Sequence, residues 1–357
     1  MKLTRRALLT LAGLAALGVT TPACRQMLKQ ILFSPEATPA APPGPVPNPF
    51  RTRGKSLVAI VHGDDVRLMV RRALDSLGGI DRLGLKDRSV LVKPNVVSGE
   101  PPPATTDPAV VRAVLEVARA GGAGSIAVGD MSAVLTLPTR PNLERTGIAR
   151  VAAETGATLL AFDEGDWIEV RPPAAELAKA VYVAKAAHEA ERLISVPIIK
   201  THRSASFSCA LKNTVGCVHG KNKPWAYGRA GWEPAVAELN LAVRPHLFVV
   251  DGLKSMVAGG PWSGEARATN VILASGDPIA LDVVALGLLK AMGRWEMVTA
   301  KGVWEQGQIR RAVALGLGAR GPEEVELVTE DLKRDGGEFG QLVGEIRRHV
   351  GLAAGVG

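Results

Sequence analysis

The 357-residue sequence predicts an α/β protein with a largely parallel, or mixed, sheet and helices on both faces. Short β-branched runs alternate with amphipathic helical patterns along the chain, and the strand runs are apolar throughout. A strand that is buried on both faces has this continuous apolar pattern, so helices must cover both sides of the sheet. We expect strands at residues 57–61, 89–92, 125–128, 158–162, 193–199, 247–250, 270–274 and 324–328.

The helical pattern is clearest in two segments between these strands. Apolar residues recur at helical spacing from Val110 to Ala118 and from Ile279 to Leu288. An Asp-Pro pair precedes each segment, at residues 107–108 and 277–278, where Asp suits the N-cap and Pro the first helical position. Both segments are therefore predicted helices with defined starts.

A glycine-rich string at residues 316–321 matches the dinucleotide-binding pattern G-x-G-x-x-G. It follows a predicted helix (residues 306–315) and precedes a strand, the reverse of the order that places a helix N-terminus on a pyrophosphate. We therefore interpret this string as a turn at a helix C-terminus.

The composition excludes a nucleic-acid-binding protein. The formal net charge is +8, of which residues 1–49 carry half, with five basic residues and one acidic residue. The rest of the chain has a surplus of only four basic side chains, and 6 Trp, 2 Tyr and 6 Phe leave little for base stacking.

The first 24 residues are typical of an export signal. Arg5 and Arg6 precede a 13-residue apolar run, which would span about 20 Å as a helix and is too short for a bilayer. The Arg pair resembles the twin-arginine signal, so we expect the twin-arginine translocase as a partner and a periplasmic or cell-surface location. The alternative is a chance Arg pair in a general secretory signal.

The residues after the signal predict how the chain is anchored and divided. Cys24 follows Thr21-Pro22-Ala23 and could carry a lipid anchor, but Thr21 stands where a lipobox usually has Leu, which argues against one. Residues 25–49 form a predicted Pro-rich linker, and residues 50–357 a single large α/β domain without a membrane span. Within that domain, residues 201–232 fit neither the helical nor the strand period, and we interpret them as a functional insertion.

Polar side chains follow five expected strands at the points where those strands end. They are Lys93 and Asn95, Asp130, Lys200 and His202, Asp251, and Ser275 to Asp277. Ligands of open α/β sheets bind at the carboxyl ends of the strands, so this pattern predicts a binding site there. The alternative interpretation is that strand ends are wet and carry polar residues for that reason alone.

The same residues lie in ordered motifs that resemble an uncharacterised family, domain of unknown function 362, over roughly residues 57–328. These motifs are VKPN (92–95), TTDP (105–108), VGD (128–130), KTH (200–202), LKNTVG (211–216), VDG (250–252) and SGDPIALD (275–282). The resemblance implies the site and the topology, but the family has no settled common reaction.

Many members of that family carry four-cysteine motifs for iron–sulfur clusters, and this chain departs from them. Its 3 cysteines cannot supply the usual four thiolates, so we expect no intrinsic iron–sulfur cluster. The cofactor remains open, with a divalent metal as one candidate and a redox protein as a further candidate partner.

The predicted site residues fall into two groups by role. Lysines and amides can hold a carboxylate or phosphate, and His or Asp can move a proton. The predicted catalytic residues are Lys200, His202, Lys212 and Asp251. The predicted substrate-binding residues are Lys93, Asn95, Thr105, Thr106, Asp130 and Asn213. The alternatives are surface lysines and a structural histidine.

A possible metal set lies in or beside the insertion. His202, Cys209, Cys217 and His219 are ligand types that suit zinc, although their spacing matches no standard zinc module. Free buried thiols and a disulfide between the two cysteines are the other interpretations.

Two functions follow from these patterns. The first is an exported enzyme that acts on a small anionic molecule at the carboxyl ends of the strands. The second is a redox- or metal-related accessory protein that binds without turnover.

Overall fold

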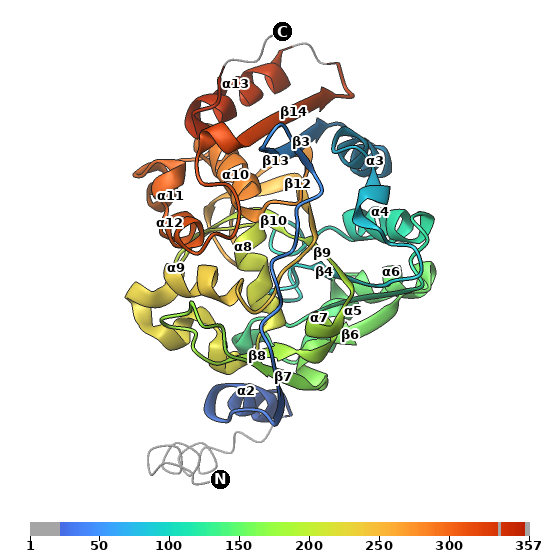
Figure 1. Ribbon diagram of the computed structural model, residues 1–357, viewed down its shortest axis with the longest axis vertical. Coiled ribbons are helices and arrows are strands. Elements are labelled where there is room, and N and C mark those ends of the chain that lie inside the picture. The colour runs from blue at the N-terminus through green and yellow to red at the C-terminus, as the bar shows by residue number, and fades with distance from the viewer. Residues whose placement is uncertain (1–21, 335–336, 354–357) are drawn as a thin grey trace.

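A mixed sheet of eleven strands forms the centre of the molecule (Figure 1), which confirms the predicted fold class. The computed structural model describes residues 22–334 and 337–353. The strands of this sheet are β2 (Arg51–Thr52), β3 (Lys55–His62), β4 (Ser89–Pro94), β5 (Ser125–Asp130), β6 (Thr158–Ala161), β9 (Arg192–Val196), β10 (Ile198–His202), β11 (Ser206–Ser208), β12 (Leu247–Gly259), β13 (Gly264–Ser275) and β14 (Val325–Asp331).

The eight expected strands are all present, with shifted bounds. The expected strand at 193–199 is two strands, because Pro197 lacks an N–H and separates β9 from β10. The strands expected at 247–250 and 270–274 extend into a long hairpin, β12 and β13. The sequence pattern missed five short strands: β1 (Ala37–Ala40), β2, β7 (Trp167–Val170), β8 (Val181–Ala184) and β11.

One strand direction corrects the predicted site. The order of the main path is β14-β3-β13-β12-β9-β4-β5-β6, and β13 is antiparallel to both of its neighbours. Ser275, at the end of β13, therefore pairs with Phe248 near the start of β12. The prediction that Ser275 to Asp277 join the other polar groups is wrong, because a hairpin reverses this strand and puts its carboxyl end at the opposite end of the sheet.

Helices cover both faces of the sheet, as the apolar strand runs predict (Figure 1). In β3, Ala59 and Val61 belong to the core on one face, and Val58 and Ile60 to the core on the other. The first face carries α3 (Val66–Ser76), α4 (Pro108–Ala120) and α6 (Ile148–Thr155). The second face carries α8 (Ala210–Asn213), α9 (Gly228–Leu239), α10 (Pro278–Met292), α12 (Gly307–Ala314) and α13 (Glu338–Val350).

Short helices connect these elements. The remaining α-helices are α2 (Pro22–Leu32), α5 (Thr139–Arg145), α7 (Lys185–Glu189) and α11 (Glu296–Thr299). The insertion expected at 201–232 is largely built of short turns of helix, among them α8, η4 (Thr214–Cys217), η5 (Gly220–Asn222) and η6 (Pro224–Tyr227). Within the described part of the chain, no helix has the length and apolarity needed to cross a bilayer.

The expected linker at 25–49 packs against the domain over much of its length, so it differs from a free spacer. Helix α2 and strand β1 (Ala37–Ala40) lie within or across its bounds, and β1 pairs in parallel with β7 in a three-stranded sheet with β8. Met27 and Ile31 pack against a third hydrophobic core, which includes Trp167, Ile168 and Val181 of β7 and β8, and this contact holds the segment. The expected signal at 1–24 lies outside the described residues except for Pro22 to Cys24, which begin α2.

Candidate functional site

A cleft of about 430 Å³ opens where the ends of β5 and β10 meet the short helices of the insertion. Its size suits a small molecule. Its polar lining residues are Asn95, Asp130, His202, Arg203, Ser204, Lys212 and Lys223. Six of the predicted site residues thus lie in or directly behind one cleft: Lys93, Asn95, Asp130, Lys200, His202 and Lys212.

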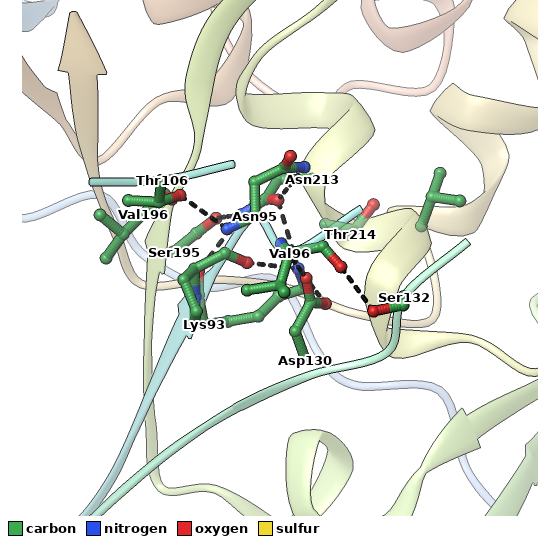
Figure 2. Close-up of polar contacts among 12 residues, drawn as sticks. Lys93, Asn95, Val96, Thr106, Asp130, Ser132, Ser195, Val196, Asn213 and Thr214 are labelled. Carbon is green, nitrogen blue, oxygen red and sulfur yellow. Dashed lines mark hydrogen bonds and ion pairs between the residues drawn. The ribbon is translucent and has the colours of Figure 1, made fainter. Parts of the chain in front are cut away.

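A buried ion pair forms the floor of this cleft. Lys93 Nζ lies 2.7 Å from Asp130 Oδ1, and the two side chains are 1% and 2% exposed. Lys93 Nζ also donates to Pro94 O at 2.8 Å and to Asn213 Oδ1 at 3.2 Å, while Asp130 Oδ2 accepts from Val96 N at 2.6 Å (Figure 2). These partners offset the cost of burying both charges, so the pair is a fixed part of the scaffold.

Two asparagines join the ion pair to a second lysine. Asn213 Oδ1 accepts from Asn95 Nδ2 at 3.1 Å, and Asn213 Nδ2 donates to Ser195 Oγ at 2.9 Å (Figure 2). Asn95 Oδ1 accepts from Lys200 Nζ at 3.0 Å, and the same amine donates to Ala104 O at 2.8 Å. Burial, and then the charge of Lys212, hold the pKa of Lys200 well below its ordinary value.

Three further predicted site residues do not line the cleft either. Thr105 Oγ1 donates to Glu100 O at 2.7 Å, and Thr106 Oγ1 donates to Val196 O at 2.8 Å. Asp251 Oδ2 accepts from Asp107 N at 2.7 Å, and burial raises the pKa of this carboxyl to about 7. In the structure, these groups hold the loop that leads from β4 into α4.

Lys212 differs from the other lysines of the site. Its side chain is half-buried and lines the cleft, and no described residue forms a hydrogen bond or ion pair with its Nζ. Burial, and then the charges of Lys223 and Lys93, lower its pKa to about 7. The site therefore presents an amine that is partly unprotonated at neutral pH.

A buried carboxylate holds the short helix that carries Lys212. Asp282 Oδ1 accepts from Ala210 N at 2.6 Å, and Asp282 Oδ2 accepts from Leu211 N at 3.1 Å. These are the first two N–H groups of α8, which have no partner within the helix. Asp282 thereby fixes where Lys212 enters the cleft.

His202 lines the cleft as a neutral ring with its proton on Nε2. Its Nδ1 accepts from Ser204 N at 3.1 Å and from Ala205 N at 3.2 Å, so Nδ1 carries no proton. Burial, and then the charge of Lys212, keep the pKa of His202 well below its ordinary value. The ring therefore offers a hydrogen-bond donor rather than a base.

The sequence interpretation missed two cations and an aromatic wall. Lys223 Nζ donates to Val215 O at 2.7 Å, and burial lowers its pKa to about 8. Arg203 is exposed, and its Nε donates to Gly260 O at 3.0 Å. The apolar lining includes Trp225, Trp232 and Trp262. Their positions in the sequence could have indicated both cations, because Arg203 directly follows the KTH motif and Lys223 lies within the insertion.

The four candidate metal ligands do not converge. Within residues 22–334 and 337–353, no group of three His, Cys, Asp or Glu residues could hold a metal ion. Cys209 and Cys217 are free buried thiols rather than a disulfide, and burial raises the pKa of Cys217 to about 12. His219 Nδ1 accepts from Lys221 N at 3.2 Å, and its ring packs edge-on against Trp167.

Comparisons with known proteins bear on the same region. A family model described as "Domain of unknown function (DUF362)" matches residues 90–287, which include the cleft-lining motifs. The Thylakoid-associated protein sll1697 of Synechocystis sp. is 28% identical over 228 residues, which cover 62% of this chain and 69% of that protein. The lactate racemase apoprotein from Thermoanaerobacterium thermosaccharolyticum aligns with a TM-score of 0.43 at 10% identity, over 83% of this chain and 86% of that one.

Proposed function

The chain belongs to the DUF362 family, and we propose that it is an enzyme that binds a small anionic substrate, a carboxylate or a phosphate, in the cleft beside Lys212. The charge of the lining carries this proposal. Arg203, Lys212 and Lys223 line the cleft, and among the described lining residues Asp130 is the one carboxylate, already paired with Lys93. Basic side chains therefore outnumber acidic ones in the lining of the cleft, which favours the binding of an anion.

The proposed roles follow from how free each group is to meet a ligand. Arg203 and Lys223 bind the anion, since both have N–H groups left over after their single hydrogen bond to a carbonyl. Lys212 is the reacting amine, and His202 donates from Nε2. Lys93 and Lys200 lie one layer deeper and position the asparagines, because their amines are already bonded to protein acceptors.

The test measures anion binding by the full chain. Phosphate or malonate should raise the melting temperature of the wild type by mass action, as any ligand specific for the folded state does. The shift should be lost in Arg203→Gln and Lys223→Met, which remove the two proposed anion-binding groups. It should persist in the matched controls Arg71→Gln and Lys55→Met, whose side chains are exposed on other parts of the molecule.

The comparison among variants decides the outcome, because excluded anions stabilise most proteins without binding. Equal shifts in all five proteins would mean a general salt effect and would refute the anion site.

We also propose that the twin-arginine route exports the protein. The support is Arg5-Arg6 before a short apolar run. Replacing both residues with Lys should leave a reporter fused to residues 1–49 in the cytoplasm, whereas the unaltered leader should export it. Arrival of the double variant in the periplasm would contradict the proposal.

A further inference from the structure

We propose that Lys212 forms a covalent imine with the carbonyl carbon of a 2-oxo acid that carries an apolar or aromatic side chain. This inference rests on the proposed anion site and names the substrate class and the bond formed there.

The first support is the freedom of the amine. Four lysines cluster at the site, and three of them donate to a backbone carbonyl: Lys93 to Pro94 O, Lys200 to Ala104 O and Lys223 to Val215 O. Lys212 is the member of this cluster that faces the cleft with no such acceptor among the described residues. A desolvated amine beside other cations is the setting that activates lysine for addition to a carbonyl, and the pKa of about 7 agrees with it.

The second support is the pairing of cations with an aromatic wall. Three of the chain's 6 tryptophans line this one cleft, beside Arg203 and Lys223. Trp232 also packs against His202, with ring centroids 5.7 Å apart. A bare inorganic anion would use the cations and leave the indoles without a function. A carboxylate with an apolar or aromatic body uses both, since guanidinium binds the carboxylate and the indoles pack on the body.

The third support is the separation of the reacting groups in a 2-oxo acid. Its carbonyl carbon is bonded directly to the carboxylate carbon, so an acid group held by Arg203 or Lys223 brings the carbonyl toward the neighbouring amine. His202, with its proton on Nε2, lines the same cleft and can donate to the carbonyl oxygen.

The reaction balances with the groups present. The unprotonated Lys212 amine adds to the carbonyl carbon, and the proton released from nitrogen passes to oxygen, which gives a carbinolamine. Lys223, with a pKa of about 8, is largely protonated at neutral pH and supplies a proton to the hydroxyl group. The C–O bond then breaks, water leaves, and a protonated imine remains; Lys223 regains its proton from solvent.

Reductive trapping tests the bond directly. The full chain is incubated at pH 7 with phenylpyruvate, pyruvate or 3-phenyllactate in the presence of sodium cyanoborohydride, which reduces a protonated imine but not a free ketone at this pH, and its peptides are mapped by mass spectrometry. We expect the reduced adduct on Lys212, with more from phenylpyruvate than from pyruvate. Phenyllactate should give none, because it has the ring and the carboxylate but no carbonyl.

The distribution of the adduct over the lysines distinguishes a specific reactive site from nonspecific modification. An ordinary lysine with a pKa near 10.4 is almost fully protonated at pH 7, so Lys212 should carry about tenfold more adduct than the exposed Lys55, or more. Phosphate should protect Lys212 in the wild type, which gives a readout even if Lys212→Met fails to fold. In a folded Lys212→Met variant the dominant adduct should disappear, while Lys55→Met should retain it.

Two results would overturn the inference: adducts spread evenly over exposed lysines, or no adduct on Lys212 from phenylpyruvate or pyruvate. The proposed function fails separately. A phosphate-dependent melting shift that requires Arg203 and Lys223, without any adduct on Lys212, would retain the anion site and refute the imine. Loss of both results would refute both.

Discussion

Buried carboxylates and buried lysines differ in the hydrogen-bond partners and counter-charges that this fold gives them. Asp277 accepts from Ile279 N, Ala280 N and Ala319 N and from Ser56 Oγ, all within 2.7–3.0 Å. Asp251 and Asp282 likewise accept two backbone N–H groups each. Each of these carboxylates accepts at least two hydrogen bonds from donors that belong to the scaffold, so each one stabilises a loop or a helix start.

The lysines of the cluster are not all held in this way, because Lys212 has no hydrogen-bond partner among the described residues. Lys93 has a counter-charge in Asp130, but Lys200, Lys212 and Lys223 are buried or half-buried with no carboxylate paired to them among the described residues. Burial and the neighbouring positive charges lower the pKa of all three amines, and the proposed anion would relieve the cost of keeping them charged. The carboxylates therefore maintain the fold, whereas Lys212 and Lys223 line the proposed anion site.

The largest expected effect is on the carboxylate side of this comparison. Asp282→Ala removes the acceptor of two backbone N–H groups inside the core and should lower the free energy of unfolding by about 3 kcal/mol. Urea unfolding would measure it. Lys212→Met should leave stability unchanged or raised, because it removes a poorly solvated amine; a loss in Lys212→Met as large as that in Asp282→Ala would break the distinction.

The next effect tests the packing that holds the ion pair. A Cβ at Gly216 would collide with Asp130 Oδ1 and lie 2.6 Å from Lys93 Nζ. Gly216→Ala should therefore cost about 1–3 kcal/mol by overpacking and should weaken the phosphate-dependent melting shift. Gly340→Ala is the matched control, since its Cβ would meet nothing within 4 Å. Equal stabilities of the two variants would contradict this account.

The free energy of unfolding should depend on pH in opposite directions for the buried carboxylate Asp282 and the amine of Lys212. The pKa of Asp282 is raised from 3.8 to about 7, so the folded state binds more protons there and its contribution to stability falls as pH rises between these values. The pKa of Lys212 is lowered from 10.5 to about 7, so the unfolded state binds more protons and stability rises between pH 7 and 10.5.

Unfolding free energies measured from pH 4 to 10 would check both signs. Asp282→Asn should flatten the fall on the acidic side, and Lys212→Met should flatten the rise on the basic side. A variant that flattens neither limb would contradict the pKa shift of its group, because a group with the same pKa in the folded and unfolded states adds no pH dependence.

For the two thiols beside the site, Cys209 and Cys217, we expect no reaction with an alkylating reagent in the native protein. Burial, and for Cys209 the neighbouring Asp282, raise the pKa of both thiols, so neither forms a thiolate at neutral pH. Iodoacetamide should leave Cys209 and Cys217 unmodified in the native protein and label them after unfolding in urea, as judged by peptide mapping. Rapid native labelling would assign the site's reactivity to sulfur instead of the Lys212 amine.

Local sequence patterns determined the strand positions and the residues at their ends. A continuous apolar run predicts a strand buried on both faces wherever it lies in the fold, and Asp-Pro at 107–108 and 277–278 marks helix starts by backbone geometry alone. Lys93, Asn95, Asp130, Lys200 and His202 were therefore identifiable as candidates from their places in the chain.

Tertiary structure alone decided how those candidates are used. The direction of β13 depends on the hairpin that precedes it, so the motif at 275–282 supports the scaffold from the other end of the sheet. The insertion, with no periodic pattern, brings Arg203 and Lys223 to the cleft through short turns of helix. The freedom of Lys212 and the tautomer of His202 are set by partners distant in sequence or by the local path of the backbone. A one-dimensional pattern records what a side chain is, whereas burial and the partners around it determine its charge and its reactivity.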